Sequence, residues 1–234
     1  VYVSDRLKNI DEKIYYNIDA LHRAISKGVQ IRFLYFNWAL DFNRPDKIYR
    51  EFRHNSEFYC VSPWALTWDN ENYYLIAYDA SAPEGSRIRN YRVDKMEKIQ
   101  LTDKHREGAQ HFRDNFSPAA YSRKMFGMFT GHEERVRLRC RKDAINILRD
   151  RFGSELMVQP DDSTHFFASV TVAVSPQFYA WVVGLNGAVR IVGPQSVCEA
   201  FRKLLLDRLR PFGDRCAILL CGVAFGLYHV NLGQ

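Results

Sequence analysis

The apolar residues of this chain change their spacing near residue 28, and that change limits the folds available to it. Six of the earlier ones recur three or four positions apart: Leu7, Ile10, Ile14, Ile18, Leu21 and Ile25. This spacing predicts an amphipathic helix that begins after Ser4 and ends before Gly28. Five short aromatic and β-branched runs follow and predict strands over 30–38, 58–68, 73–79, 87–93 and 97–102. Short strands in such close succession imply a small, strongly bent sheet or barrel.

A second pattern begins near residue 134. Residues 135–141 alternate strictly between arginine and apolar side chains, and apolar residues at helical spacing follow over 144–152. The remaining predicted elements are strands over 155–159 and 165–174, a helix opening at Ser175-Pro176, a strand over 188–192 and a last helix. The order βαββαβα is the ferredoxin-like arrangement with one extra helix. The predicted class is α+β: a helix and small β-barrel, then a ferredoxin-like domain.

These changes of pattern predict five segments. They are a linker helix (1–28), a barrel domain (29–103), a helical connector (104–133), the ferredoxin-like domain (134–210) and a tail (211–234). The apolar part of the tail is broken by glycines and is shorter than the ~18 residues that a membrane-spanning helix needs. An accessory strand, a docked tail and a non-native read-through all stay open for it.

Composition narrows the class of protein. Hydrophobic residues make up 47% and charged residues 26% of the chain, as in ordinary soluble globular proteins. The whole surplus of the +6 net charge lies after residue 103, where 18 basic residues face 12 acidic ones. This surplus permits a polyanionic partner. Five scattered cysteines without a CxxC pair, and the lack of a signal-peptide pattern, predict reduced thiols, a cytoplasmic location and no membrane partner.

The common enzyme motifs are missing from the sequence. It contains no GxSxG, GxGxxG, GxxxxGK[ST] or HExxH, and its seven histidines are dispersed. We therefore expect no enzyme activity, no metal and no cofactor.

Two arrangements of side chains suggest binding surfaces. The first is a row at every second position of one predicted strand: Arg135, Arg137, Arg139 and Arg141. Their guanidinium groups should leave one face of the sheet, while Val136, Leu138 and Cys140 enter the core. This face is either a solvated surface that resists edge pairing, which we favour, or a secondary surface for an anion or a partner.

The second arrangement mixes aromatic rings and arginines on the barrel strands. The rings are Tyr59, Trp64, Trp68, Tyr73, Tyr74, Tyr78 and Tyr91, and the arginines are Arg87, Arg89 and Arg92. Interleaved rings and guanidinium groups on a small barrel suit base stacking combined with phosphate contact. Strand alternation places about half of the rings in the core, so a structural role for them stays open.

Three segments of these strands resemble the WYL domain of bacterial transcriptional regulators. They are Pro63-Trp64-Ala65-Leu66, the stretch from Asn72 to Asp79, and Asn90-Tyr91-Arg92-Val93-Asp94-Lys95-Met96. Tyr73 stands where the family has its namesake Trp, and Lys95 replaces an arginine, which removes a planar fork for bidentate contacts. The segment from Ile25 to Trp38 looks like the family's opening helix end and first strand. Residues 135–210 are similar to its usual C-terminal extension.

The resemblance implies an Sm-like, SH3-type barrel that senses single-stranded nucleic acid or a nucleotide-like effector. It implies a homodimer whose operator DNA is bound by a winged helix-turn-helix that does not precede Val1, so we expect a fragment or a stand-alone sensor. Its predicted ligand site comprises Tyr35, Ser62, Tyr74, Tyr78, Arg89, Arg92 and Lys95. Arg92 and Lys95 would take phosphate, Tyr74 would meet a base, and the first helix would pass the signal to DNA-binding heads.

The alternative is an interaction or oligomerisation module without a nucleic-acid ligand. The two hypotheses differ in whether Arg89 and Arg92 converge with Tyr74 in one cavity or pair with acidic neighbours on an open face.

Overall fold

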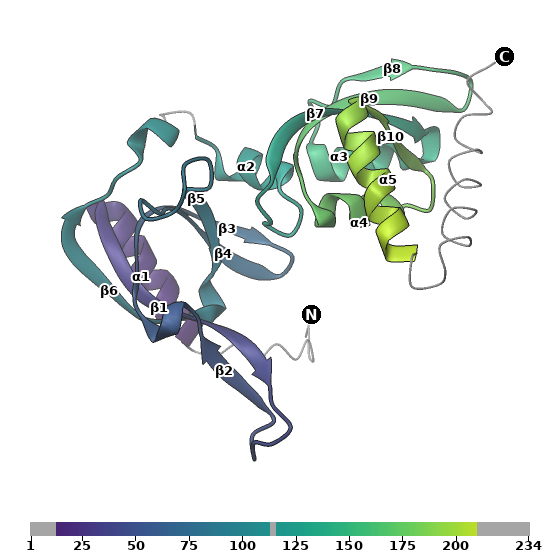
Figure 1. The fold of residues 1–234 in the computed structure, drawn as a ribbon. Coiled ribbons are helices and arrows are strands. Elements are labelled where there is room, and N and C mark those ends of the chain that lie inside the picture. Colours follow the sequence, from purple (N-terminus) through teal and green to yellow (C-terminus); the bar gives the residue numbers. More distant parts are fainter. Residues whose placement is uncertain (1–12, 113–115, 210–234) are drawn as a thin grey trace, which may run out of the picture. The chain divides into compact units, whose positions relative to one another are not determined.

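The computed structural model describes residues 13–112 and 116–209, which divide into two compact units. The first unit extends to Ser122 and includes Gly127–Thr130, and the second comprises Arg123–Phe126 and continues from Gly131. Each unit combines helices with an antiparallel sheet, which confirms the predicted α+β class (Figure 1). The predicted helix start at Ser4 and the predicted tail lie outside the described residues.

The first unit is one helix followed by a curled antiparallel sheet. Its elements are α1 (Lys13–Lys27), β1 (Val29–Leu40), β2 (Ile48–Phe52), β3 (Tyr59–Asp69), β4 (Asn72–Tyr78), β5 (Ile88–Arg92) and β6 (Met96–His105). The strand order is β2-β1-β3-β4-β5, with β6 also paired to β1. A 3-10 turn, Val93–Lys95, joins β5 to β6. All five predicted strands are present, and Gly28 ends α1 with a φ of +64°, which favours glycine.

The core of this unit lies between α1 and the concave side of the sheet. Leu21 and Ala24 of α1 are fully buried against Ile31 and Phe33 of β1. The Phe33 ring stacks on Tyr59 at 5.5 Å between centroids and meets Tyr91 edge-on at 5.2 Å. Of the seven rings in the predicted aromatic set, Tyr74, Tyr78 and Tyr91 are buried, close to the half that alternation implied.

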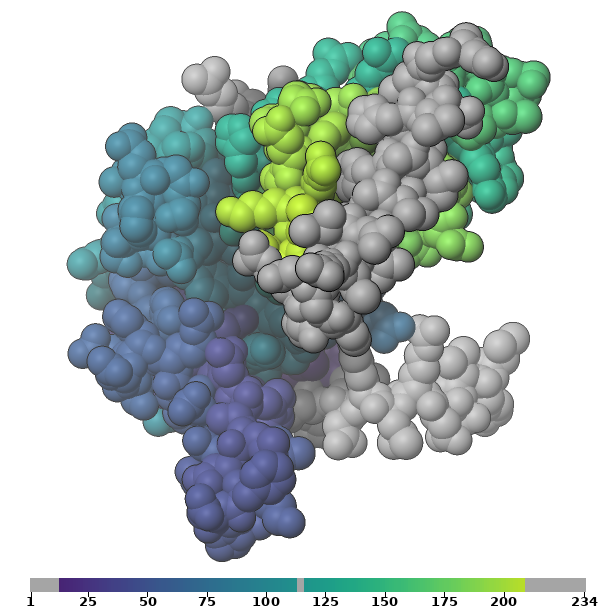
Figure 2. All heavy atoms as spheres, turned by 45° about the vertical axis from the view of Figure 1, so that its right-hand side comes forward, coloured from purple at the N-terminus to yellow at the C-terminus, as the bar shows by residue number. Residues whose placement is uncertain are grey.

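The sequence did not indicate strand β2, which pairs with the second half of β1 to form a hairpin arm. We use this name for Phe36–Phe52. The arm projects from the first unit, in purple to blue (Figures 1 and 2). None of the residues of β2 is buried, so the alternation of buried and exposed positions that marks the other strands is absent here.

The second unit is a four-stranded sheet with helices on one face. Helix α2 (Pro118–Lys124) leads into it, and its elements are β7 (His132–Arg141), α3 (Ile145–Phe152), β8 (Val158–Pro160), β9 (His165–Val174), α4 (Pro176–Gly184), β10 (Val189–Gly193) and α5 (Gln195–Leu209). The antiparallel order β10-β7-β9-β8 confirms the predicted ferredoxin-like topology. Ser175 caps α4 by accepting a hydrogen bond from the Phe178 amide, with Pro176 in the first turn.

One face of this sheet forms the core of the second unit. Val136, Leu138 and Cys140 are buried together with Leu148 of α3 and Phe178 of α4. Burial raises the pKa of the Cys140 thiol to about 12, so it stays protonated at neutral pH. Over the described residues, no helix combines the length and the apolar character that crossing a bilayer requires.

Candidate ligand-binding site

The first unit contains a cavity of about 680 Å³. Its lining residues are Tyr35, Asn37, Arg53, Tyr74, Ser86, Arg89, Asn90, Tyr91, Arg92, Lys95 and Gly127–Thr130. Sites for small molecules usually span about 300–1,000 Å³, so the volume suits a ligand of nucleotide size. Five of the seven predicted site residues line this cavity: Tyr35, Tyr74, Arg89, Arg92 and Lys95.

Strand pairing positions the central residues of the cavity. Tyr74 of β4 lies directly opposite Arg92 of β5, which places their side chains on one face of the sheet. The Tyr35 hydroxyl of β1 accepts a hydrogen bond from the Arg92 amide at 3.2 Å. Burial raises the pKa of both Tyr35 and Tyr74, so each presents a neutral hydroxyl that can donate to an anion.

Both predicted arginines are held by aspartates. Arg92 donates through Nε and Nη2 to Asp94, at 3.0 and 2.7 Å. Arg89 Nε lies 3.4 Å from a carboxylate oxygen of Asp79. Arg89 and Arg92 therefore line one cavity with Tyr74, and both also pair with acidic neighbours. The two arrangements, which the sequence analysis treated as alternatives, occur together. Each pairing fixes the side chain, and no hydrogen bond to a described residue occupies Nη1 of Arg92.

Asp79 is the centre of a buried hydrogen-bond network behind the cavity. It accepts hydrogen bonds from the Ser81 hydroxyl at 2.6 Å and from the Tyr91 hydroxyl at 3.3 Å. This burial and the nearby carboxylate raise the pKa of Tyr91, which stays a neutral donor. The network fixes the carboxylate that positions Arg89.

Two further cations, Arg53 and Lys95, line the cavity. Among the described residues, neither Arg53 nor Lys95 forms an ion pair. Partial burial, and then the neighbouring Arg92, hold the pKa of Lys95 below its usual value. The cavity thus carries four cationic side chains against the carboxylates of Asp79 and Asp94, and its excess positive charge favours an anionic ligand.

The Lys95 ammonium should titrate below the usual pH of a lysine side chain, and an anion in the cavity should raise its pKa. The unfolded chain holds this proton more tightly than the folded one. The contribution of Lys95 to the free energy of unfolding therefore increases as pH rises from the folded pKa to the unfolded value of about 10.4. Titration of the ¹³Cε signals, with and without pyrophosphate, measures both effects. A Lys95 pKa that pyrophosphate leaves unchanged would contradict an anion site here.

Ser62 and Tyr78, the other two predicted site residues, do not line the cavity. The Ser62 hydroxyl is buried and accepts a hydrogen bond from the Glu107 amide at 2.8 Å. The Tyr78 hydroxyl accepts one from Arg87 at 3.3 Å, and its ring stacks on His111 at 5.4 Å. Both side chains hold the segment after β6 against the sheet.

Sequence reasoning missed several lining residues. Asn90 lies two positions before Arg92 on β5, so strand alternation could have identified it. Arg53 follows β2, a strand that the sequence did not indicate, and Gly127–Thr130 comes from the predicted connector. No local pattern relates these two segments to β5.

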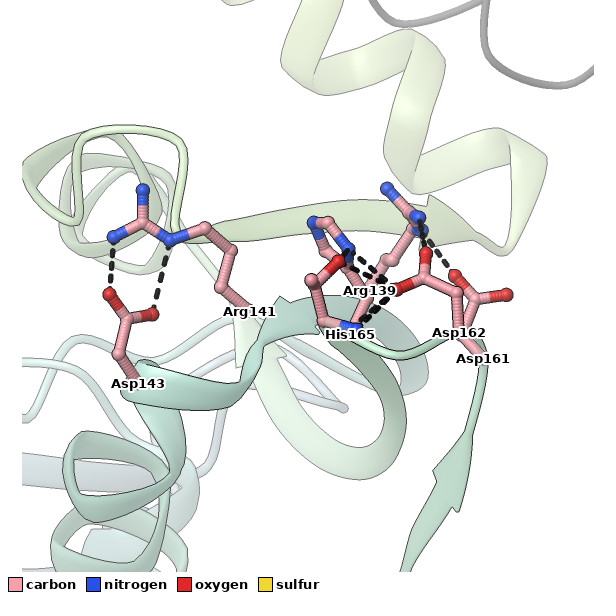
Figure 3. A network of polar contacts seen from close by, with 7 residues as sticks. Arg139, Arg141, Asp143, Asp161, Asp162 and His165 are labelled. Atoms are coloured by element: carbon pink, nitrogen blue, oxygen red, sulfur yellow. Dashed lines mark hydrogen bonds and ion pairs between the residues drawn. The ribbon is translucent and has the colours of Figure 1, made fainter.

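The arginine row on β7 shows the predicted alternation. Arg139 pairs with Asp161 at 2.6 Å and with Asp162 at 2.8 Å, and Arg141 pairs with Asp143 at 2.5 Å (Figure 3). The Arg137 guanidinium lies over the Phe167 ring, 4.0 Å from its centroid. Two of the four charges are therefore matched by neighbouring carboxylates, an arrangement typical of a solvated face. Within the described ranges, no three His, Cys, Asp or Glu side chains gather as a metal site.

Two solved structures show similarity to this chain. Proteasome accessory factor B/C (PafBC) of Arthrobacter aurescens is 19% identical with a TM-score of 0.33, over 83% of this chain and 26% of that one. A CRISPR Cas-related protein is 12% identical with a TM-score of 0.44, over 86% of this chain and 53% of that one. The chain thus spans about a quarter and about half of their respective lengths. Comparison with curated proteins gave no match.

Two family models match consecutive parts of the sequence. The model of the WYL domain matches residues 16–101, which include α1 and the curled sheet, and the model of the WCX domain matches residues 132–207. Together they span more than half of the chain. The chain therefore belongs to the WYL-domain family and carries a WCX domain after its WYL domain.

Proposed function

We propose that this chain is the ligand-sensing part of a transcriptional regulator, and that its WYL domain binds single-stranded nucleic acid or a nucleotide-like effector. One observation carries the proposal: Arg53 and Lys95, which form no ion pair in the described structure, share a cavity with Arg92 and Tyr74. Unmatched cations next to an aromatic ring suit a ligand that combines phosphate with a base. The role is one of binding and regulation.

Each part of such a ligand has a counterpart in the cavity. Phosphate would bind Arg53, Lys95 and the remaining N–H groups of Arg92, and a base would stack on Tyr74 or on the exposed ring of Phe129. Binding would favour one arrangement of the protein over another, and α1 would pass that bias to DNA-binding heads of a homodimer.

Fluorescence anisotropy of a short labelled single strand, beside the matching duplex, tests this site. We expect Arg92→Ala to weaken single-strand binding about tenfold, the effect of one charge-assisted hydrogen bond. Arg23→Ala is the matched control, because Arg23 lies exposed on α1, pairs with Asp19 and does not line the cavity. Equal affinities for the two variants would contradict the assignment.

A double variant, Arg135→Ala with Arg137→Ala, tests whether the arginine row on β7 binds the oligonucleotide in place of the cavity. These two arginines form no ion pair among the described residues. We expect no change in affinity from the double variant. If the double variant weakens binding and Arg92→Ala leaves it unchanged, the nucleic-acid site lies on the WCX sheet.

The exposed apolar residues of the hairpin arm favour the interaction module as a second candidate function. Trp38, Leu40, Phe42 and Ile48 are each more than half exposed. Exposed apolar patches of this kind often mark interfaces between proteins. Failure to bind either form of DNA, together with self-association that Trp38→Ser abolishes in sedimentation velocity, would support this alternative.

A further inference from the structure

Four residues of the cavity wall have a special place in the chain. Gly127–Thr130, which we call the strap, line the cavity of the WYL domain, whereas Arg123–Phe126 before them and the chain from Gly131 onward belong to the WCX unit. The strap is therefore covalently bonded to the WCX unit at both of its ends.

The chain is firmly anchored just before the strap. The Phe126 ring is buried in the WCX core, with its centroid 5.2 Å from both Phe178 and Trp181. The carbonyl of Met125 accepts a hydrogen bond from the Arg151 side chain of α3. After the strap, β7 begins at His132 and pairs along its length with β9. Only a few residues separate these anchors, so a displaced strap must pull on them or change its own backbone torsions.

Asn90 connects the strap to the ligand cavity. Its side-chain amide donates to the Met128 carbonyl at 2.9 Å, and its carbonyl oxygen accepts from the Tyr121 hydroxyl at 3.3 Å. Asn90 also lines the cavity. A ligand that competes for this amide, or that presses on Phe129, acts directly on the strap.

Two residues of the strap have an unusual backbone conformation. Gly127 and Met128 both have left-handed φ values, 59° and 58°. Methionine rarely adopts this region, and such strain persists only where surrounding contacts hold it. Here those contacts are the Asn90 hydrogen bond and the burial of Met128.

We propose that the strap transmits occupancy of the cavity to the WCX domain. Ligand binding changes the Asn90–Met128 contact and the backbone of Gly127 and Met128, and the change reaches the WCX core through Met125 and Phe126. This inference rests on the proposed function, because it needs a ligand in that cavity.

The methionines provide direct reporters of this coupling. The chain has four, Met96, Met125, Met128 and Met157. Met128 lies in the strap and Met125 at the WCX anchor, whereas Met96 belongs to the WYL core and Met157 is exposed beside β8. We would label the methyl groups with ¹³C and titrate the chain with the short single strand. We expect the Met128 and Met125 signals to shift together, and the Met96 and Met157 signals to stay in place.

Two variants test the role of Asn90 at saturating oligonucleotide. In Asn90→Ala the Met128 signal should still shift, while the Met125 shift falls by at least half. Tyr121→Phe is the matched control, because it removes the other hydrogen bond of Asn90 and leaves the one to Met128. It should behave as the wild type. Unchanged Met96 and Met157 signals in the free variants show that both domains are folded.

The outcomes separate the inference from the proposed function. If Met128 shifts and Met125 does not in the wild type, the ligand binds but the strap does not transmit, which overturns the inference alone. An equal Met125 shift in Asn90→Ala overturns it too. If no methyl signal shifts and anisotropy detects no binding, the proposed function fails and the inference fails with it.

Discussion

Replacing Phe33 with alanine should lower the free energy of unfolding of the WYL domain by about 3–5 kcal/mol. Phe33 is fully buried, and its ring contacts Tyr59, Tyr91 and Tyr35. Truncation removes these contacts and leaves a cavity among rigid rings that cannot collapse to fill it. Denaturant titration followed by fluorescence and circular dichroism measures the loss, and resolves it from unfolding of the WCX domain.

Phe58→Ala is the matched control for this substitution. Phe58 is 38% exposed and lies under the Arg32 guanidinium, so its removal should cost less than about 1 kcal/mol. A similar small loss in Phe33→Ala would show that the aromatic cluster does not stabilise the curled sheet.

The double variant Arg53→Ala with Lys95→Ala should weaken single-strand binding about 100-fold. Each side chain would contribute one charge-assisted contact to phosphate, and each such contact is worth about a factor of ten or more. The slope of log K against log salt should also become shallower by about 1.4, since each phosphate contact to a single strand contributes about 0.7. Anisotropy at several salt concentrations measures both quantities.

The free energy of unfolding of the double variant distinguishes a loss of ligand contacts from damage to the fold. Neither side chain forms an ion pair among the described residues, and the surroundings of Lys95 already disfavour its charge. We therefore expect the free energy of unfolding to stay within about 0.5 kcal/mol of the wild type. The pair Arg23→Ala with Lys47→Ala removes the same charge outside the cavity and is the control. An equal loss of affinity in the control would indicate a diffuse electrostatic effect instead of a defined site.

Several elements of the fold could be predicted because their signals are local. The helical spacing of Ile14, Ile18, Leu21 and Ile25 continues through α1, and alternation on β7 correctly assigned Val136 and Leu138 to the core. The family resemblance placed Tyr74 and Arg92 in one site, and the β4–β5 register makes them direct neighbours. A strand buries every second residue and a helix every third or fourth, so both elements can be recognised from the spacing of apolar residues along the chain.

The tertiary structure decided which residues line the cavity, because local sequence patterns do not contain this information. Arg53 and Gly127–Thr130 are both separated from β5 by long stretches of sequence, and only folding brings them to one cavity with Lys95. Folding also places Ser62 and Tyr78 in hydrogen bonds outside the cavity, and it pairs Arg89 with Asp79. The sequence by itself determined the family and, apart from β2, the strands and their order, because these depend on spacing along the chain. Which residues line the cavity depends on the distances between segments that are far apart in the sequence. Tertiary packing sets these distances.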